Sequence, residues 1–119
     1  MSIWFKAVTL EDCARLDAGM HEKGTLMQTL GIVHGGANVA LAETVASYAA
    51  NFVVDFTRYY CVGQEINANH LKASRNGELT ATTKPIHIGK RSSVWEILIH
   101  NSAGQLCCIS RMTAAVVER

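Results

Sequence analysis

The sequence runs directly from the tripeptide His34-Gly35-Gly36 into a long stretch of small and apolar residues whose one acid is Glu43. This stretch predicts a helix that begins at Gly35 or Gly36 and runs to about Asp55. Apolar side chains cover almost its whole circumference, and a helix that is apolar all round is buried all round. In a chain of 119 residues, a sheet that wraps the helix is the natural way to bury it. This segment therefore predicts a long buried helix at the centre of the fold.

The rest of the chain adds a short helix and a series of strands. A helix is predicted over residues 10–17, because Thr9-Leu10-Glu11-Asp12 is typical of a helix start. Four later segments are typical of strands, at residues 59–71, 78–88, 93–100 and 106–117. Asn76-Gly77 is a hairpin signal, and Pro85 marks a bulge or an edge strand. One long helix followed by an antiparallel meander is an α+β pattern.

Composition narrows the class of protein. The length and the 49% content of hydrophobic residues fit one compact domain over residues 1–119. A formal net charge of +1 indicates neither a nucleic-acid footprint nor a polybasic membrane anchor. The apolar run at residues 37–54 contains Asn38, Glu43 and Asn51, so it is interpreted as a buried helix rather than a membrane span. No signal-peptide pattern opens the chain, and we expect no membrane association.

Cysteine and histidine spacing argues against disulfides and metal. The chain has four cysteines, Cys13, Cys61, Cys107 and Cys108, with no Cys-x-x-Cys motif. We expect reduced thiols in a cytoplasmic protein, with the adjacent Cys107 and Cys108 on opposite faces of a strand. The five histidines show no metal-ligand spacing, so no metal site is predicted.

Two features of the first segment carry chemistry. Glycines at a helix start let a ligand approach bare backbone N–H groups at the positive end of the helix dipole. A lone carboxylate in an apolar helix must be solvated, paired or used, and Ser47 lies one turn from Glu43 on the same face. Together they would supply an oxyanion binder and a base or nucleophile. Two plainer interpretations stay open: a tight turn into a helix, and a Glu43 paired from a distant strand.

The spacing of these groups predicts assembly. Glu43 comes eight residues after Gly35, so the helical rise separates the two by about 12 Å. One carbonyl group cannot contact both. If both act on one substrate, the carboxylate must come from a second subunit, which predicts at least a dimer.

Two further places have polar groups that could bind a ligand. His70 ends an apolar strand segment, where it lines a pocket or lies on the strand surface. The turn Gly89-Lys90-Arg91-Ser92-Ser93 combines two cations, two hydroxyls and a glycine. Such a turn suits a phosphate-bearing ligand, although a solvated turn fits the composition equally well.

Four runs, in order along residues 31–117, resemble a known family. They are GIVHGGANVALAETVAS, VGQEINANHLKAS, PIHIGKRSSVWEI and LCCISRMTAAVV. The chain resembles the hotdog-fold, PaaI-like acyl-CoA thioesterases, and within them the 1,4-dihydroxy-2-naphthoyl-CoA and enterobactin-proofreading thioesterases. The resemblance implies one long central helix wrapped by a curved antiparallel sheet, a homodimer or homotetramer, and thioester hydrolysis with no metal or other cofactor.

The resemblance also implies roles for particular residues. The Gly35 N–H would polarise the thioester carbonyl, Glu43 would be nucleophile or general base, and Ser47 would help to position water. His34 and His70 would line the site, together with Gly36. The nucleotide end of CoA would meet Lys90, Arg91, Ser92 and Ser93.

The chain departs from the family pattern before the His-Gly-Gly motif. The family has a first strand and a loop there, about 25 residues by usual element lengths, whereas here Leu30-Gly31-Ile32 runs directly into Val33-His34. The fold is therefore expected to lack the family's first strand, which would expose a sheet edge and part of the helix. The family's loop carries a Gln near the thioester, and Gln28 is the candidate for it in this chain.

The predicted function is hydrolysis of an aryl- or acyl-CoA thioester to the free acid and CoA. One alternative is a hotdog module that binds a CoA ester or a partner without turnover. The other is a hotdog hydratase or dehydratase, which would use a His with an Asp or Glu. Scattered residues of two subunits would form the walls of the pocket that binds the acyl group.

Overall fold

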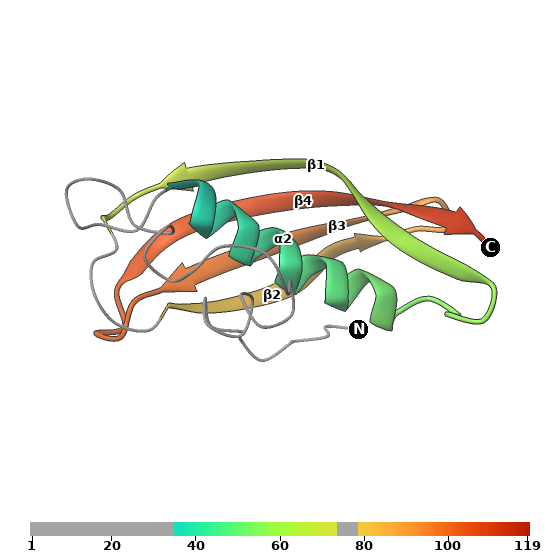
Figure 1. Cartoon of the computed structure of the whole chain (residues 1–119), viewed down its shortest axis with the longest axis horizontal. Coiled ribbons are helices and arrows are strands. Elements are labelled where there is room, and N and C mark those ends of the chain that lie inside the picture. Colours follow the sequence, from blue (N-terminus) through green and yellow to red (C-terminus); the bar gives the residue numbers. More distant parts are fainter. Residues whose placement is uncertain (1–34, 74–78) are drawn as a thin grey trace.

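The computed structural model describes residues 35–73 and 79–119. Its elements are α2 (Gly35–Phe52), β1 (Tyr59–His70), β2 (Thr80–Ile88), β3 (Ser92–His100) and β4 (Leu106–Glu118). The strands form a four-stranded antiparallel sheet, and α2 lies along one of its faces (Figure 1). This arrangement confirms the α+β hotdog prediction. The helix predicted over residues 10–17 and the segment expected to lack a strand both lie outside the described residues.

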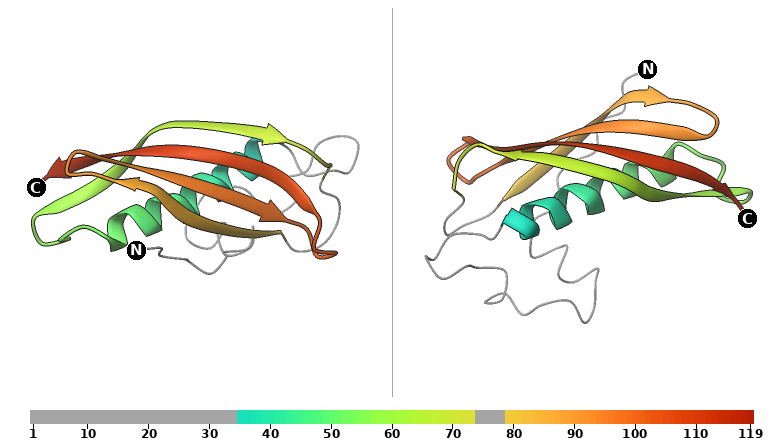
Figure 2. Two further views of the ribbon diagram at one scale, coloured as in Figure 1. Left: turned by 180° about the vertical axis from the view of Figure 1, so that it is seen from behind. Right: turned by 90° about the horizontal axis from the view of Figure 1, so that it is seen from above.

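The helix α2 starts at Gly35, as predicted, and ends at Phe52, three residues before the predicted end. Its alanines favour helix, and no proline interrupts it. The buried face comprises Ala37, Asn38, Leu41, Ala42, Val45, Ala46, Ala49 and Ala50. On the other side, Glu43, Tyr48 and Phe52 are exposed, Phe52 to 75%. The prediction of burial all round was therefore wrong, because within the described residues the sheet covers one side of the helix (Figure 2).

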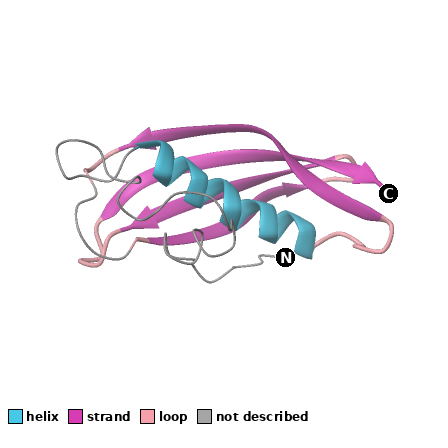
Figure 3. Cartoon of the chain, in the orientation of Figure 1, coloured by secondary structure: helices cyan, strands magenta, loops and turns pink. Residues whose placement is uncertain are grey.

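The strand order is β1-β4-β3-β2. Strands β2, β3 and β4 form the predicted meander, and β1 pairs with β4 along its whole length. The interpretation of Asn76-Gly77 as a hairpin signal was wrong in that β1 and β2 do not pair with each other and lie at opposite edges of the sheet (Figure 3). Residues 76 and 77 themselves lie outside the described residues.

Two register shifts bend the edge strands. In β2 the pairing with β3 shifts between Pro85 and His87, which confirms that Pro85 marks both a bulge and an edge strand. In β1 the pairing with β4 shifts between Gly63 and Glu65, so that Gln64 is the bulged residue. The second bulge lies beside α2 and shapes the site described below.

The core lies between α2 and the sheet. Alternate residues of β3 face it: Ser93, Trp95, Ile97 and Ile99 are fully or almost fully buried. Trp95 donates its indole N–H to the Ser93 hydroxyl at 2.8 Å, which satisfies a donor that burial would otherwise leave unpaired. This inward row packs against the buried face of α2.

The three cysteines that the structure describes are buried. Cys61, Cys107 and Cys108 carry free thiols, and Cys13 lies outside the described residues. Cys107 and Cys108 are both fully buried, and only Cys108 belongs to the hydrophobic core cluster of the described residues, so the expectation that the two point to opposite faces is not contradicted. The β3–β4 register shifts there: Ile99 pairs with Cys108 and His100 with Leu106, so that Cys107 is skipped. Among residues 35–73 and 79–119, no helix is long and apolar enough to cross a membrane.

Candidate active site

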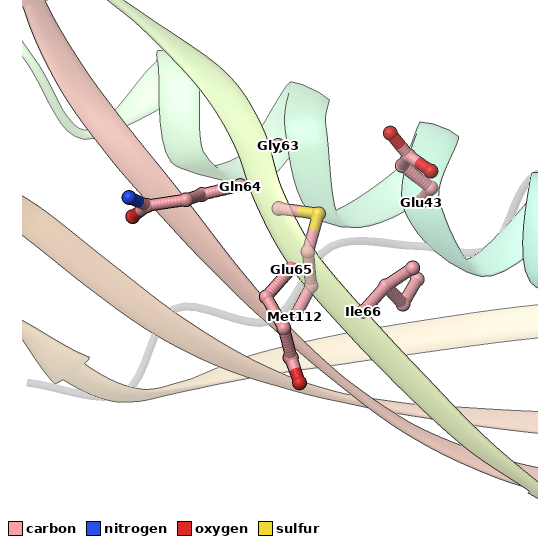
Figure 4. Close-up of a pocket in the computed structure, with 6 residues that line it drawn as sticks. All are labelled: Glu43, Gly63, Gln64, Glu65, Ile66 and Met112. Carbon is pink, nitrogen blue, oxygen red and sulfur yellow. The ribbon is translucent and has the colours of Figure 1, made fainter.

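A pocket of about 190 Å³ opens where α2 passes β1. Glu43 of α2 lines it together with Gly63, Gln64, Glu65 and Ile66 of β1 and Met112 of β4 (Figure 4). The carboxylate of Glu43 is exposed to solvent here. Among the predicted catalytic residues that the structure describes, Glu43 is thus the one that lines this pocket.

Within the described parts of the chain, no side chain forms an ion pair or hydrogen bond with the Glu43 carboxylate. The alternative that a distant strand pairs this acid therefore finds no support in residues 35–73 and 79–119. The second carboxylate at the pocket, Glu65, differs, because it accepts a hydrogen bond from Asn67 Nδ2 at 3.2 Å. Glu43 is solvated and available to a ligand, as a base or nucleophile must be.

The bulge at Gln64 determines which residues of β1 face Glu43. Gly63 pairs with Ala114 and Ile66 with Met112, and both partners are buried on the α2 side of β4. Residues three apart in a regular strand face opposite ways, so the extra residue lets Gly63 and Ile66 face the same side. The pocket wall therefore depends on this irregularity of β1.

Met112 links the pocket to Ser47. The half-buried Ser47 hydroxyl donates to Met112 Sδ at 3.9 Å, a weak hydrogen bond to sulfur, and Met112 itself lines the pocket. Ser47 therefore lies next to the pocket without lining it. Its predicted part in positioning water stays a prediction.

The helix α2 is fixed to β1 at its far end. The Asn51 side chain donates to the Cys61 carbonyl at 3.2 Å and accepts from the Cys61 N–H at 2.7 Å. These two bonds satisfy the backbone of β1 as a neighbouring strand would. They fix the position of α2 along β1, and this position places Glu43 opposite Gly63.

Gly35 and His70 meet at the opposite end of α2. A methyl group built on Gly35 would lie 3.2 Å from Nε2 of His70, so the imidazole packs against the first residue of the helix. Gly36 is exposed beside it. His34 and Gln28, which were predicted to act nearby, lie outside the described residues.

The residues of the turn between β2 and β3 differ in their exposure to solvent. Lys90 and Arg91 are exposed, and Ser92 is half-buried at the start of β3. The Ser93 hydroxyl is instead buried and accepts the bond from Trp95. The part of the turn that faces solvent is therefore Lys90, Arg91 and Ser92, and the Ser93 side chain serves the core.

Sequence reasoning missed most of the pocket lining. It did not single out Gly63, Gln64, Glu65, Ile66 or Met112. The available signal was Gly63, because a glycine inside a strand pattern often marks a bulge or a close approach. No group of three or more His, Cys, Asp or Glu side chains within residues 35–73 and 79–119 could hold a metal ion.

Comparison with known proteins identifies the family. Residues 30–108 match the family described as "Thioesterase superfamily". The chain is 41% identical over 102 residues to the 1,4-dihydroxy-2-naphthoyl-CoA hydrolase of Escherichia coli, which covers 86% of this chain and 74% of that protein. The chain therefore belongs to the thioesterase superfamily of thioester hydrolases, as the resemblance predicted.

Solved structures agree in fold. Thioesterase HI1161 from Haemophilus influenzae matches with a TM-score of 0.81 and 35% identity, over 97% of this chain and 72% of that one. A mutant of thioesterase PA1618 from Pseudomonas aeruginosa matches with a TM-score of 0.79 and 38% identity, over 99% of this chain and 76% of that one. The hotdog architecture is therefore shared with known thioesterases.

Proposed function

We propose that the protein hydrolyses an aryl- or acyl-CoA thioester to the free acid and CoA. The observation that carries this proposal is the Glu43 carboxylate, which is exposed in a pocket and has no partner within the described residues. Membership of the thioesterase superfamily supports the reaction type.

In the proposed mechanism, the N–H at Gly35 polarises the thioester carbonyl. Backbone N–H groups at a helix start have no partner within the helix and lie at its positive end, so they stabilise the oxyanion that forms on attack. The nucleophile then adds to the carbonyl carbon, and the C–S bond breaks as the oxyanion collapses. A proton passes to the departing thiolate, which leaves as the free thiol of CoA.

Glu43 supplies the nucleophilic half of this reaction in one of two ways. As a general base it takes a proton from water, which attacks the carbonyl, and then returns the proton to the leaving sulfur. As a nucleophile it attacks directly, forms a mixed anhydride and releases the acid when water hydrolyses that anhydride. Ser47, held next to the pocket through Met112, is proposed to orient the water.

The separation of the two groups supports a dimeric site. Gly35 and Glu43 lie on one helix, about 12 Å apart along its axis, and each contacts a different part of β1. We propose that Glu43 of one subunit acts with Gly35 of another in a homodimer or homotetramer. The outer edge of β1 borders no described strand, and Tyr48 and Phe52 are exposed on α2, which supports contact with a second copy.

We further propose that Lys90 and Arg91 meet the phosphates of CoA, with Ser92 and the backbone of the turn. Both cations are exposed and neither forms a salt bridge among the described residues. Cationic side chains are suited to phosphate recognition. The free thiols support, in addition, a cytoplasmic location.

The test is a hydrolysis assay in which a reagent traps the released thiol, run over a panel of aliphatic and aromatic acyl-CoAs. The 1,4-dihydroxy-2-naphthoyl ester belongs in the panel, because a relative bears that substrate in its name. Saturable release of CoA would support the proposal and would rank the acyl groups.

Two other results of the assay have defined meanings. Binding of CoA esters without thiol release would favour a non-catalytic binding module. Conversion of an enoyl or hydroxyacyl ester with the thioester intact would favour a hydratase or dehydratase. Either result would contradict the proposed hydrolysis.

A further inference from the structure

Gly63 lies so close to the Glu43 carboxylate that a side chain at position 63 would overlap the carboxylate in its present position. A methyl group built on Gly63 would lie 2.9 Å from Glu43 Oε1, 3.6 Å from its carboxyl carbon and 3.7 Å from Met112 Sδ. Non-bonded carbon and oxygen atoms do not normally approach within 3.0 Å, so a side chain at position 63 would displace the carboxylate or the strand. The bare Cα of Gly63 is thus part of the pocket wall.

The conformation of the backbone does not explain why a glycine stands here. Gly104 has the only positive φ within the described residues, at 80°, so the φ of Gly63 is open to any residue type. Glycine inside a strand lowers stability, because it loses more conformational freedom on folding and packs no side chain. The lack of space beside the Glu43 carboxylate is what favours a glycine at position 63.

The surroundings leave the carboxylate little freedom if that space is filled. The two bonds between Asn51 and Cys61 oppose a sliding of α2 along β1. The pairing of β1 with β4 on both sides of the bulge opposes a retreat of the strand. An added methyl group is therefore accommodated mainly by rotation of the flexible, exposed Glu43 side chain away from the pocket.

We propose that Gly63 is a positioning residue for Glu43: its missing side chain keeps open the place in the pocket where the carboxylate lies. The proposal rests on the proposed thioesterase function, in which that carboxylate acts as base or nucleophile. Gly63 contributes through Glu43, and the bulge at Gln64 turns it toward that side chain.

The first test is Gly63→Ala. We expect kcat to fall by about 10- to 100-fold, because displacing a catalytic group by about 1 Å costs up to that much. KM should change less than threefold, since the nucleotide end of the substrate is bound elsewhere. An unchanged kcat would overturn the proposal.

The second test removes the contact from the other side. In Glu43→Asp the carboxylate is one methylene shorter and no longer reaches the space beside position 63. Gly63→Ala should therefore reduce kcat at least fivefold less in the Glu43→Asp protein than in the wild type, in the manner of a double-mutant cycle. Equal losses in both backgrounds would mean that Gly63 acts independently of Glu43, and would overturn the proposal.

A thermal-unfolding cycle needs no activity and separates this inference from the proposed function. Gly63→Ala should change Tm more favourably in Glu43→Ala, where the crowding is gone, than in the wild type, because alanine leaves the unfolded chain fewer conformations than glycine does and only the crowding opposes that gain. Equal changes in Tm in the two backgrounds would contradict the inference. If the wild type hydrolyses no thioester, the proposed function fails, and this cycle still tests the contact.

Discussion

The imidazole of His70, the last residue of β1, packs against Gly35, the first residue of α2, with 3.2 Å between Nε2 and a methyl group built on the glycine. This contact places a polar ring beside the first residue of the helix, at the end where the helix dipole is positive. Glu43 lies about two turns further along the same helix and lines the pocket between α2 and β1, which neither Gly35 nor His70 lines. The two halves of the proposed chemistry are therefore at separate places in one chain.

Subunit complementation tests whether two chains share a site. Glu43→Gln chains and Gly35→Val chains should each be nearly inactive alone, the second because the larger side chain collides with His70. After random exchange, about half of the dimers are mixed and each has one intact site, so about a quarter of wild-type activity should return. Absence of rescue, with exchange verified by mass spectrometry, would point to a site within one chain.

Replacing the proposed base tests the chemistry itself. Glu43→Gln keeps the shape of the side chain but removes its ability to take a proton or attack carbon. We expect kcat/KM for a good acyl-CoA substrate to fall at least about a hundredfold.

A second carboxylate provides the control for this substitution. Glu96 is paired with Lys84 at 3.3 Å, on the sheet face away from α2. Glu96→Gln should leave turnover within about twofold of the wild type, because a partly exposed pair contributes little to stability. Near wild-type turnover in Glu43→Gln would reject the mechanism.

The exposed cations of the β2–β3 turn are tested by substrate comparison. Lys90→Ala with Arg91→Ala should raise KM for acyl-CoA and change kcat less, because the phosphates lie far from the reacting carbonyl. The increase should shrink at high salt, which screens the attraction. A small thioester without the nucleotide should be unaffected, and an equal effect on both substrates would assign the turn a structural role.

Ser93 should behave differently from its neighbours in that turn. Ser93→Ala removes the acceptor of the buried Trp95 indole N–H, which we expect to cost about 1–3 kcal/mol in the free energy of unfolding. KM for acyl-CoA should change little, because the hydroxyl faces the core. Denaturant unfolding and steady-state kinetics measure the two effects, and a raised KM at unchanged stability would place Ser93 among the ligand contacts.

The turn that leads from α2 into β1 should be sensitive to acid. Hydrogen bonds from the Thr57 hydroxyl at 2.7 Å and the Thr57 N–H at 3.1 Å hold the pKa of Asp55 below its ordinary value of 3.8. A lowered folded-state pKa gives stability that is present above the unfolded value and is lost as the pH falls through the folded value. Thr57→Val should therefore lower Tm at pH 7, and the difference should narrow below about pH 4. A difference independent of pH would contradict this account.

The sequence by itself determined the local structure of the described residues. The polar–apolar alternation of β3 and β4 marked their ends to within a residue or two, because alternate residues of a strand face opposite sides. Gly35 marked the start of α2, and Pro85 marked an edge and a bulge through its missing N–H. The motifs around Glu43 were specific enough to indicate the family. Such features depend on residues that are neighbours along the chain, so they can be predicted from the sequence alone.

Only the tertiary structure decided which segments meet. The local sequence pattern of β1 suits pairing with β2 as well as with β4, and only the structure shows that β1 pairs with β4. The exposure of Phe52, the turning of Ser93 toward Trp95 and the approach of Gly63 to Glu43 follow from how the sheet packs on α2. Contacts between residues distant in sequence depend on the balance of burial over the whole domain, and no local pattern encodes that balance.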